Sequence, residues 1–403
     1  MTTAITPHDV SDSEIFVEDR WREPFEAMRQ TMPVSYLPES PYGPYWSVVS
    51  HDLIQQVEGQ PDVYSSSYKL GGITIGDSLG EDEFPNFIAM DRPRHTEQRK
   101  VVQPSFNPSE MARRDVEIAQ RTKELFDALP VGETFDWVER VSIPLTIGML
   151  CILFDFPWEE RHDLKRWSDH ASNVSPDQTP ERRAIFYEQM FQMLTRFDQL
   201  LEEKRALPPA DDLLSRVIHS AAMGDMAPME RVANIALLIV GGNDTTRNSM
   251  SGFVEACTQY PDELDRLRAD RSLIPNAAQE IIRWQSPVTH MRRTCTEDVE
   301  LAGQKLAKGD KVVLWYISGN RDEALFADAE RFDVTRQNAR RHIGFGYGVH
   351  RCVGARLAEL QLGRLIGEIV ERNIRIEMVE QPTRLASCFL HGFTEMPVRI
   401  VGA

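Results

Sequence analysis

The chain has 403 residues, of which 45 are Lys or Arg and 62 are Asp or Glu, giving a net charge of −17. This acidic balance argues against nucleic acid or an anionic membrane as a main partner. No apolar run approaches the roughly 18 residues that a membrane span needs, and the N-terminus shows no signal-peptide pattern. The five cysteines are scattered and odd in number, which argues against a disulfide framework and favours a cytoplasmic setting.

The predicted elements are mostly helices. The first 20 or so residues are polar, and we expect them to be loosely held. Short β-prone runs occur at residues 45–49, 311–315 and 396–401. Amphipathic helical segments cover residues 107–128, 140–152, 180–205, 229–260, 275–285 and 355–372. No stretch has the composition of a domain linker, so we expect residues 1–403 to form a single, mainly α domain with a small β-rich part.

A glycine-rich loop precedes the last long helix, in the run Phe345-Gly346-Tyr347-Gly348-Val349-His350-Arg351-Cys352-Val353-Gly354. The helix N-terminus, the loop N–H groups and nearby cations are expected to lower the pKa of the Cys352 thiol. A dinucleotide site is excluded, because Arg351 stands where the third glycine should be. No second ligand stands at zinc spacing. A small buried hydrophobe and a thiolate ligand remain as interpretations of Cys352.

The pattern Phe-Gly-x-Gly-x-His-x-Cys-x-Gly in this loop resembles the haem-ligand signature of the cytochrome P450 family. The resemblance implies a cytochrome P450 fold in which haem b (iron protoporphyrin IX) is buried between a long oxygen-groove helix and the cysteine-ligand helix. It implies that Cys352 is the axial ligand of the iron, with Phe345, Gly346 and Gly354 shaping the loop around the cofactor. A thiolate ligand favours O–O cleavage, so the implied activity is insertion of one oxygen atom of O2 into an unactivated C–H bond.

The segment 229–260 would form a helix roughly 45 Å long, enough to cross the molecule. At its centre stands the run Gly241-Gly242-Asn243-Asp244-Thr245-Thr246. Two glycines cost a helix about 1 kcal/mol each. They suggest either a packing notch or a groove for dioxygen where the helix opens, and Thr245 is placed to bond the Gly241 carbonyl. By resemblance, Thr245 and Asp244 deliver protons during dioxygen activation, and Asp244 is expected to exchange partners or meet solvent.

Glu280 and Arg283 stand three residues apart on one predicted helix face and can pair. Such pairs are usually solvated surface pairs. The family, however, carries a buried Glu-x-x-Arg pair in this position, with a third partner before the cysteine loop. Arg331 resembles that partner. By resemblance, this trio holds the cysteine loop in place and takes no part in the chemistry.

The resemblance also implies cations for the two haem propionates. His95 and Arg99 stand four residues apart, so a helix would point both side chains the same way. Arg293 resembles a third cation, and its neighbour Arg292 is the alternative. His342 and His350 flank the cysteine loop and are expected to add hydrogen bonds.

The substrate pocket is expected to be apolar. Its predicted lining includes the helices near residues 170–195 and the residues Leu238, Gly242, Val288, Met291, Phe389 and Leu390. The runs at residues 69–75, 84–91 and 241–250 are similar to those of bacterial alkane terminal hydroxylases. That similarity implies terminal (omega) hydroxylation of medium-chain n-alkanes, alcohols or fatty acids.

Electrons must come from another protein, since the chain has no flavin or iron–sulfur motif. A basic patch is expected on the cysteine side, formed by Arg113, Arg114, Arg351, Arg356 and Arg364. It would receive a ferredoxin that a ferredoxin reductase supplies from NAD(P)H. Three other interpretations remain: a steroid or terpenoid hydroxylase, a peroxide-driven enzyme, and a haem-based gas sensor without turnover.

Overall fold

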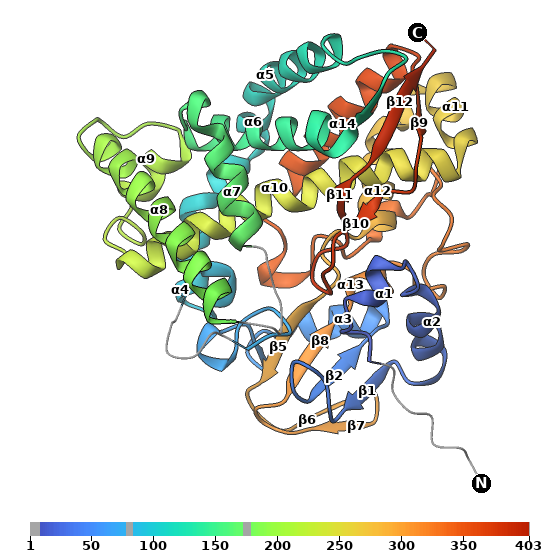
Figure 1. Cartoon of the computed structure of the whole chain (residues 1–403). Coiled ribbons are helices and arrows are strands. Elements are labelled where there is room, and N and C mark those ends of the chain that lie inside the picture. The colour runs from blue at the N-terminus through green and yellow to red at the C-terminus, as the bar shows by residue number, and fades with distance from the viewer. Residues whose placement is uncertain (1–8, 78–83, 172–178, 403) are drawn as a thin grey trace.

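The computed structural model describes residues 9–77, 84–171 and 179–402. Helices dominate these ranges, as expected for a mainly α protein (Figure 1). The helices are α1 Glu14–Val17, α2 Arg22–Thr31, α3 His51–Glu58, α4 Arg94–Val102, α5 Pro108–Asp127, α6 Ile143–Phe154, α7 Arg161–Ala171, α8 Pro180–Arg205, α9 Leu213–Ile218, α10 Pro228–Gln259, α11 Pro261–Ala269, α12 Ile274–Gln285, α13 Tyr316–Gly319 and α14 Ala355–Glu371.

The six predicted helical segments are confirmed within a few residues as α5, α6, α8, α10, α12 and α14. Local signals explain why these ends are predictable. The Asn107 side chain caps α5 by accepting from the Glu110 N–H at 2.9 Å, and Thr179 caps α8 in the same way. Pro228 occupies the first turn of α10, where a missing N–H costs nothing.

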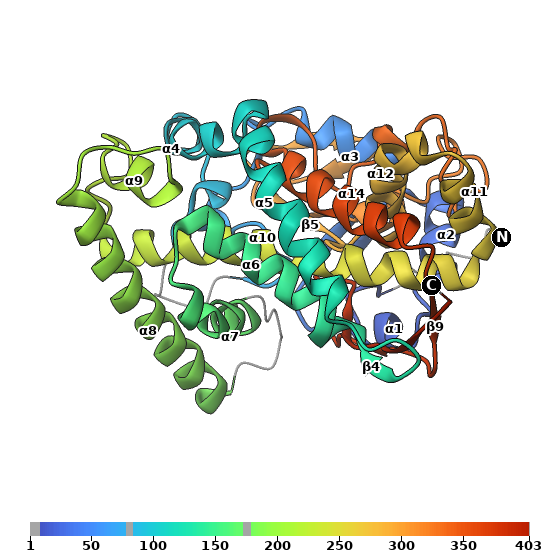
Figure 2. The same cartoon turned by 90° about the horizontal axis from the view of Figure 1, so that it is seen from above.

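α10 crosses the whole molecule, and α14 runs beside it over part of its length (Figure 2). Most of its side chains from Val232 onward are buried. The helices α6, α7, α12 and α14 pack directly against it. The helix with the predicted oxygen groove therefore packs against the helix that follows the predicted cysteine ligand.

The main sheet has five strands in the order β1-β2-β8-β5-β3. Its strands come from two separate parts of the chain: β1 Val34–Leu37, β2 Tyr45–Val48, β3 Tyr64–Ser65, β5 Met291–Cys295 and β8 Lys311–Leu314. The β2–β8 pair is parallel and the other pairs are antiparallel. The sheet forms a separate β-rich part below α10 in Figure 1.

The predicted C-terminal strand forms as β12 Pro397–Val401 but does not join the main sheet. It pairs with β4 Thr134–Asp136 and β9 Arg375–Met378 in a three-stranded sheet. Two short hairpin pairs complete the strands: β6 Val299–Leu301 with β7 Gln304–Leu306, and β10 Thr383–Arg384 with β11 Phe393–Glu395. The three predicted strands therefore belong to two sheets.

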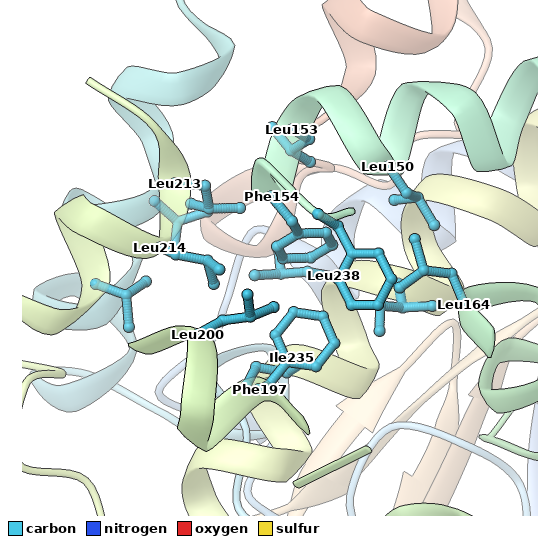
Figure 3. Close-up of a cluster of buried hydrophobic side chains, with 14 of the residues drawn as sticks. Leu150, Leu153, Phe154, Leu164, Phe197, Leu200, Leu213, Leu214, Ile235 and Leu238 are labelled. Atoms are coloured by element: carbon cyan, nitrogen blue, oxygen red, sulfur yellow. The ribbon is translucent and has the colours of Figure 1, made fainter. Parts of the chain in front are cut away.

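The largest apolar clusters lie among the helices rather than in the sheet. One of them joins α6, α7, α8, α9 and α10 (Figure 3). It includes Phe154, Phe197 and Ile235, whose side chains are at most 5% exposed. This cluster fixes the face that α10 turns toward α6.

The N-terminal segment is better packed than its polar composition suggested. Residues 1–8 lie outside the described ranges, but Val10 and Phe16 are buried in an apolar cluster with Trp21. The expectation of a loose segment is therefore wrong for residues 9–20. Over the described ranges, no helix has the length and hydrophobicity of a membrane span.

Candidate active site

The cysteine loop is closed by backbone hydrogen bonds. The Cys352 N–H donates to the Phe345 carbonyl at 2.8 Å, and the Gly346 N–H donates to the Ile343 carbonyl at 2.8 Å. Gly346 and Gly348 both have a φ of +67°, a conformation that side chains with a Cβ rarely adopt. The glycines are therefore required by the path of the backbone that brings Cys352 to the start of α14.

Cys352 is the only exposed residue among the five cysteines, all of which are described. Although part of the residue is accessible, protein atoms surround its thiol. This burial raises the pKa of the thiol. The Gly354 N–H, Arg99 and Arg351 act in the opposite direction. The expectation that the surroundings alone lower the pKa is wrong, because desolvation outweighs them. A bound metal ion supplies the missing positive charge and deprotonates a coordinating thiol.

The two glycines of α10 have different surroundings. A Cβ on Gly241 would meet no atom within 4 Å, whereas a Cβ on Gly242 would lie 2.7 Å from Leu150 of α6. The packing interpretation therefore holds for one of the two glycines, and the dioxygen groove stays a prediction for the other. Gly242 is a packing notch and Gly241 borders open space. α10 continues as a helix through both residues, so the expected opening of the helix does not occur.

One face of α10 carries Gly241 and the residue four positions on. The Thr245 hydroxyl donates to the Gly241 carbonyl at 3.0 Å, as the spacing predicted. Leu237, one turn earlier, is partly exposed on the same face. Leu238 is buried in the apolar cluster with Leu150 of α6 (Figure 3). Gly242 also lies against Leu150. The pocket lining by Leu238 and Gly242 therefore stays a prediction, and Gly241 is the residue of this run that borders open space.

Asp244 is fully buried beside Thr245. Its Oδ1 lies 2.8 Å from the Arg247 guanidinium and accepts from the Asn243 side chain at 3.0 Å. Arg247 also lies 3.1 Å from Asp169 of α7, whose side chain is 36% exposed. The expected link from Asp244 to solvent therefore exists as an ion-pair chain. Arg247 was missed by sequence reasoning, although its spacing of three residues from Asp244 was a usable signal.

The Glu280–Arg283 pair of α12 is completely buried, with both side chains 0% exposed. Two hydrogen bonds of 2.7 Å join the carboxylate to the guanidinium. Arg283 also donates to the carbonyls of Asn320 and Ala329, at 2.8 and 2.7 Å. The pair therefore ties α12 to the segment that precedes the cysteine loop.

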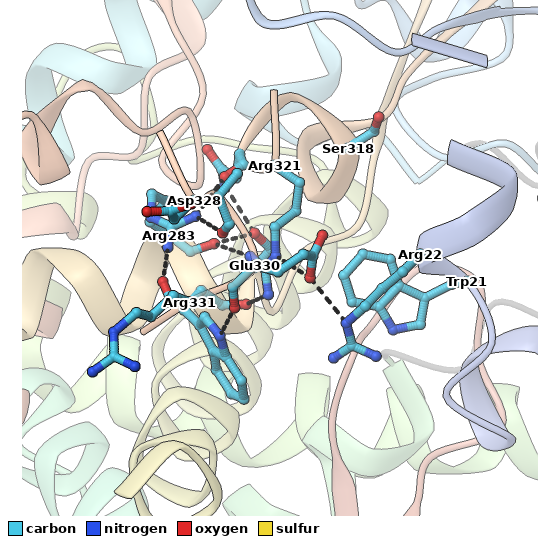
Figure 4. A network of polar contacts seen from close by, with 12 residues as sticks. Trp21, Arg22, Arg283, Ser318, Arg321, Asp328, Glu330 and Arg331 are labelled. Carbon is cyan, nitrogen blue, oxygen red and sulfur yellow. Dashed lines mark hydrogen bonds and ion pairs between the residues drawn. The ribbon is translucent and has the colours of Figure 1, made fainter. Parts of the chain in front are cut away.

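We call the Glu280–Arg283 pair and its further arginine partner the brace. Its third member is Arg336, not Arg331. Arg336 Nε lies 3.0 Å from Glu280, whereas the Arg331 side chain is 41% exposed and binds Asp262 at 2.7 Å. Arg331 contributes only its carbonyl, which accepts from Arg283 at 3.0 Å. Figure 4 shows its guanidinium directed away from Arg283. The chain turns between the two arginines, and this turn could not be predicted from spacing alone.

His342 connects the cysteine loop to α12. Its Nδ1 accepts from the Gly344 N–H at 3.1 Å, which leaves Nε2 to donate to Gln279 at 3.2 Å. The Phe345 ring centroid is 5.2 Å from that of His342. Burial, aided by Arg283, lowers the pKa of His342 to about 3, so the ring is neutral. His342 thus supports the cysteine loop from the side of α12.

The predicted propionate cations gather in one cluster. The His95 and His350 rings lie 4.2 Å apart, and the Arg99 guanidinium donates to the Arg351 carbonyl at 2.6 Å. Burial, followed by Arg99, lowers the pKa of His95 to about 4. Neither ring nitrogen of His95 and not Nδ1 of His350 has a hydrogen-bond partner among the described residues. Buried ring nitrogens without partners beside guanidinium groups fit the carboxylates of a haem.

Arg293, rather than Arg292, faces this cluster. The two residues are neighbours on β5 and therefore point to opposite faces of the sheet. Arg292 binds Asp77 at 2.6 Å, whereas Arg293 binds Glu58 at 2.8 Å. Burial, followed by the charge of Arg293, lowers the pKa of His350. Glu58 is a buried carboxylate that the sequence did not single out.

The remaining predicted pocket residues come together from two segments. Val288 pairs with Leu390 in an isolated β-bridge, and the Thr289 N–H donates to the Phe389 carbonyl at 3.0 Å. Met291 follows at the start of β5 and is partly buried. Of the predicted helices near 170–195, residues 172–178 lie outside the described ranges.

Comparisons with known proteins agree with this geometry. A family model described as Cytochrome P450 matches residues 152–384. Linalool 8-monooxygenase of Pseudomonas putida is 37% identical over 98% of both chains. Methyl-branched lipid omega-hydroxylase of Mycobacterium tuberculosis is 33% identical over 93% of this chain and 90% of that one.

Among solved structures, Cytochrome P450-153 from Novosphingobium aromaticivorans is 49% identical and superposes with a TM-score of 0.94. The match covers 98% of this chain and 100% of that one. Since the family model covers more than half of the chain and the relatives span nearly all of it, the chain belongs to the cytochrome P450 family of haem b monooxygenases.

Proposed function

We propose that this cytochrome P450 hydroxylates the terminal carbon of medium-chain n-alkanes, alcohols or fatty acids in the cytoplasm. A ferredoxin and its reductase would supply the electrons from NAD(P)H. The observation that carries the proposal is the open face of α10, where Gly241 leaves space beside the Thr245 hydroxyl. Leu237, one turn before Gly241, adds a partly exposed apolar side chain to this face, which suits a substrate held by hydrophobic contact.

The residues that would hold the cofactor are Cys352 at the iron and His95, Arg99, Arg293 and His350 at the propionates. When bound, haem b supplies dioxygen activation with a thiolate ligand. The protein must then supply protons at the open face of α10 and keep bulk water away. Thr245 is placed for the first task, because its hydroxyl is already oriented by the Gly241 carbonyl.

Asp244 would recharge this hydroxyl with protons. It is buried, so a proton must reach its carboxylate through a conformational change. Arg247 holds Asp244 on one side and Asp169 on the other, at 2.8 and 3.1 Å. If the guanidinium shifts toward Asp169, Asp244 is released to rotate, take a proton from solvent and return it to Thr245 Oγ1. Arg247 acts as a pivot between the two carboxylates.

Two segments, residues 69–75 and 84–91, are restrained by hydrogen bonds, and this restraint supports selectivity for the end of a substrate chain. The Ile73 carbonyl accepts from the Arg292 N–H at 2.7 Å, and the Ile75 N–H donates to His290 at 3.2 Å. In the second segment, the Phe87 N–H donates to the Asn234 side chain of α10 at 3.0 Å. A terminal C–H bond is stronger than an internal one, so terminal attack needs walls that do not yield to a bent chain.

Aromatic rings lie over the second segment. The Phe84 ring lies 5.4 Å from that of Phe186 and 6.2 Å from that of Tyr187 in α8. These contacts tie residues 84–91 to α8 as well as to α10. They support an apolar, narrow approach to the open face.

We place the electron-transfer surface on fewer residues than the predicted basic patch. Arg114 is 5% exposed and bonds the Ile152 carbonyl, so it lies in the interior. Arg113 and Arg364 are each paired with a carboxylate, Glu110 and Asp115. The exposed residues Arg351 and Arg356 remain beside Cys352. We place the acidic ferredoxin over these two.

The names of two relatives support oxidation of a hydrocarbon chain. One is a methyl-branched lipid omega-hydroxylase and the other a linalool 8-monooxygenase. The second name favours one alternative substrate class, a terpenoid alcohol. Both candidates use the same site and differ in the width of the approach to it.

Turnover of purified enzyme with a ferredoxin, its reductase and NADH tests the proposal. n-Octane, decanoic acid and linalool are supplied separately, and products are identified by mass spectrometry. Terminal alcohols from the octane and decanoic acid arms are expected. Predominantly internal alcohols would contradict terminal attack. Efficient oxidation of linalool alone would favour the terpenoid function. If no product forms from any of the three compounds although NADH is present, a gas sensor would be favoured.

The docking surface has its own test. Arg356→Glu is expected to slow reduction by the ferredoxin and to weaken its salt dependence. Lys305→Glu is the control, because Lys305 is also exposed but lies in the β6–β7 hairpin, far from α14 (Figure 1). Equal reduction rates for both variants and the unchanged enzyme would remove Arg356 from the docking surface.

A further inference from the structure

Glu58 is a buried carboxylate at the C-terminal end of α3, only 4% exposed. Three donors from separate elements converge on it. Its Oε1 accepts from the Tyr316 hydroxyl at 2.5 Å and from the Arg293 guanidinium at 2.8 Å. Its Oε2 accepts from the Tyr347 N–H at 2.7 Å. A carboxylate is the side chain that can accept all three bonds, because it is acceptor-only.

Arg293 is held in place by this contact. Its guanidinium has a second bond, 2.7 Å to the Arg292 carbonyl, and its side chain is 4% exposed. Because the bonds to Glu58 and to the Arg292 carbonyl fix the guanidinium, its remaining N–H groups have a defined direction. The alternation of β5 turns Arg293 to the sheet face opposite that of Arg292. The direction of Arg293 into the cation cluster therefore depends on Glu58.

The other carboxylate oxygen holds the cysteine loop. Tyr347 stands between Gly346 and Gly348, the two residues with positive φ. A Cβ on Gly348 would lie 2.5 Å from the Glu58 carbonyl, so the loop backbone rests directly on the end of α3. One side chain thus restrains both a cation for the propionates and the loop that carries the iron ligand.

We propose that Glu58 is a positioning residue of the haem site, which sets Arg293 and the Cys352 loop relative to each other and partly neutralises the Arg293 charge. It makes no contact with substrate or reacting atoms. Its effect is transmitted through Arg293 on one side of the cofactor and through the Tyr347 N–H on the other. This role goes beyond the proposed substrate class and would stand whichever substrate is oxidised.

The charge and the hydrogen bonds of Glu58 can be tested together by Glu58→Gln. An amide has one acceptor oxygen, so its NH2 group must oppose either the Tyr347 N–H or the Arg293 guanidinium. Either orientation leaves a donor facing a donor and removes the negative charge beside Arg293. A less neutralised cation stabilises the ferrous state, which has one electron more, so the reduction potential should become more positive.

The control is Glu255→Gln. Glu255 is also a buried carboxylate, 3% exposed, and binds Arg384 at 2.5 Å. Burial raises the pKa of both the Glu58 and the Glu255 carboxyl. Glu255 belongs to the C-terminal part of α10, whereas the Thr245 face lies near its centre. Both substitutions remove a buried charge, and only Glu58→Gln removes it beside Arg293.

Three readouts on the haem-loaded proteins decide the matter: the reduction potential, the rate of haem release to an excess of apomyoglobin, and the fraction of the reduced CO complex that keeps the red-shifted thiolate band. Glu58→Gln is expected to raise the potential, to release haem about tenfold faster, and to lose part of that band. Glu255→Gln should leave all three readouts unchanged. Glu58→Asp keeps the charge and should restore the potential in part.

The proposal is overturned if Glu58→Gln leaves the potential and haem release unchanged, or if Glu255→Gln shifts them equally. If Glu58→Gln does not fold, Glu58→Asp decides on the same readouts. Its shorter side chain cannot reach all three donors, so haem release must still accelerate. A wild-type release rate in Glu58→Asp would then contradict the proposal. None of these readouts requires a substrate, so they are independent of the proposed terminal hydroxylation.

Discussion

The buried carboxylate of Asp244 lies 2.8 Å from the guanidinium of Arg247, one turn further along α10. This pairing keeps a charged group stable in the core and, through Asp169, connects it to the surface. It also means that Asp244 cannot move without breaking an ion pair. Proton delivery in this enzyme should therefore depend on the pair as a unit.

Asp244→Asn should lower the rate of product formation by about a hundredfold, the order expected when a positioned proton donor is lost. Asn keeps the shape of the side chain but cannot carry a proton, and it removes the negative charge that pairs with Arg247. The measurement is product formed per minute under saturating ferredoxin. Asp169→Asn should have a milder effect, because water can replace an exposed carboxylate. Equal losses in both variants, or none in Asp244→Asn, would contradict the relay.

Thr245→Val should uncouple electron consumption from product formation. NADH use continues, the product per NADH falls several-fold, and hydrogen peroxide accumulates, because the hydroxyl that passes on the proton is gone. Thr258→Val is the matched control. Thr258 makes the same bond to the carbonyl four residues back, Val254 at 2.9 Å, on the same helix. A similar loss of coupling in the control would show that helix geometry, not the hydroxyl beside Gly241, is responsible.

The two glycines of α10 should respond in opposite ways to alanine. Gly241→Ala should stabilise the fold by up to about 1 kcal/mol, because a Cβ meets nothing there. It should also reduce activity, because the methyl group occupies the space beside Thr245. Gly242→Ala should destabilise by about 1–3 kcal/mol through the clash with Leu150. Denaturant unfolding and turnover together check this. The reverse order of stabilities would overturn the assignment of the two helix faces.

The brace gives a prediction that separates two arginines. Arg336→Ala removes a buried partner of Glu280 and should destabilise the protein by about 3–5 kcal/mol, with loss of haem. Arg331→Ala removes an exposed side chain and should cost about 1 kcal/mol or less. Its carbonyl, which Arg283 uses, remains in place. Unfolding midpoints measure both changes, and a larger loss for Arg331→Ala would contradict the brace described above.

His290 makes stability depend on pH. Burial lowers its pKa from 6.5 to about 3 in the folded protein. Nε2 accepts from the Ile75 N–H, so a proton there would oppose that donor. Between about pH 6.5 and 3, His290 is protonated in the unfolded chain but not in the folded chain. The free energy of unfolding therefore falls as the pH drops. By about pH 5 the loss from this group should reach roughly 2 kcal/mol.

His290→Gln tests this dependence. The amide can accept from the Ile75 N–H and donate toward the Cys388 carbonyl, but it does not titrate. The slope of unfolding free energy against pH should be shallower in the variant over that window, whatever its stability at neutral pH. An unchanged slope would assign the acid sensitivity to other groups.

The parts of the fold and site that could be predicted are those encoded by local patterns. The bounds of α10, the cysteine loop and the Thr245–Gly241 bond follow from residues within a few positions of one another. The proton link through Arg247 had a local signal in its spacing from Asp244, even though it was missed.

The errors concern relations that local spacing does not determine. The roles of Gly241 and Gly242 depend on which face of α10 is covered by α6, since one position rotates a helix by about 100°. The choice between Arg331 and Arg336 depends on how a loop turns. Glu58 gave no signal, because its three partners stand more than 200 positions away in the chain. The pKa of Cys352 was misjudged because burial is a property of the folded molecule.

The most direct test of the account is the position at which oxygen enters n-octane. Purified enzyme is supplied with isotopically labelled dioxygen, NADH, a ferredoxin and its reductase, and the alcohols are separated and their label measured. The account predicts that the primary alcohol is the main product and that it carries one labelled oxygen atom. A majority of secondary alcohols, or a primary alcohol without the label, would contradict it.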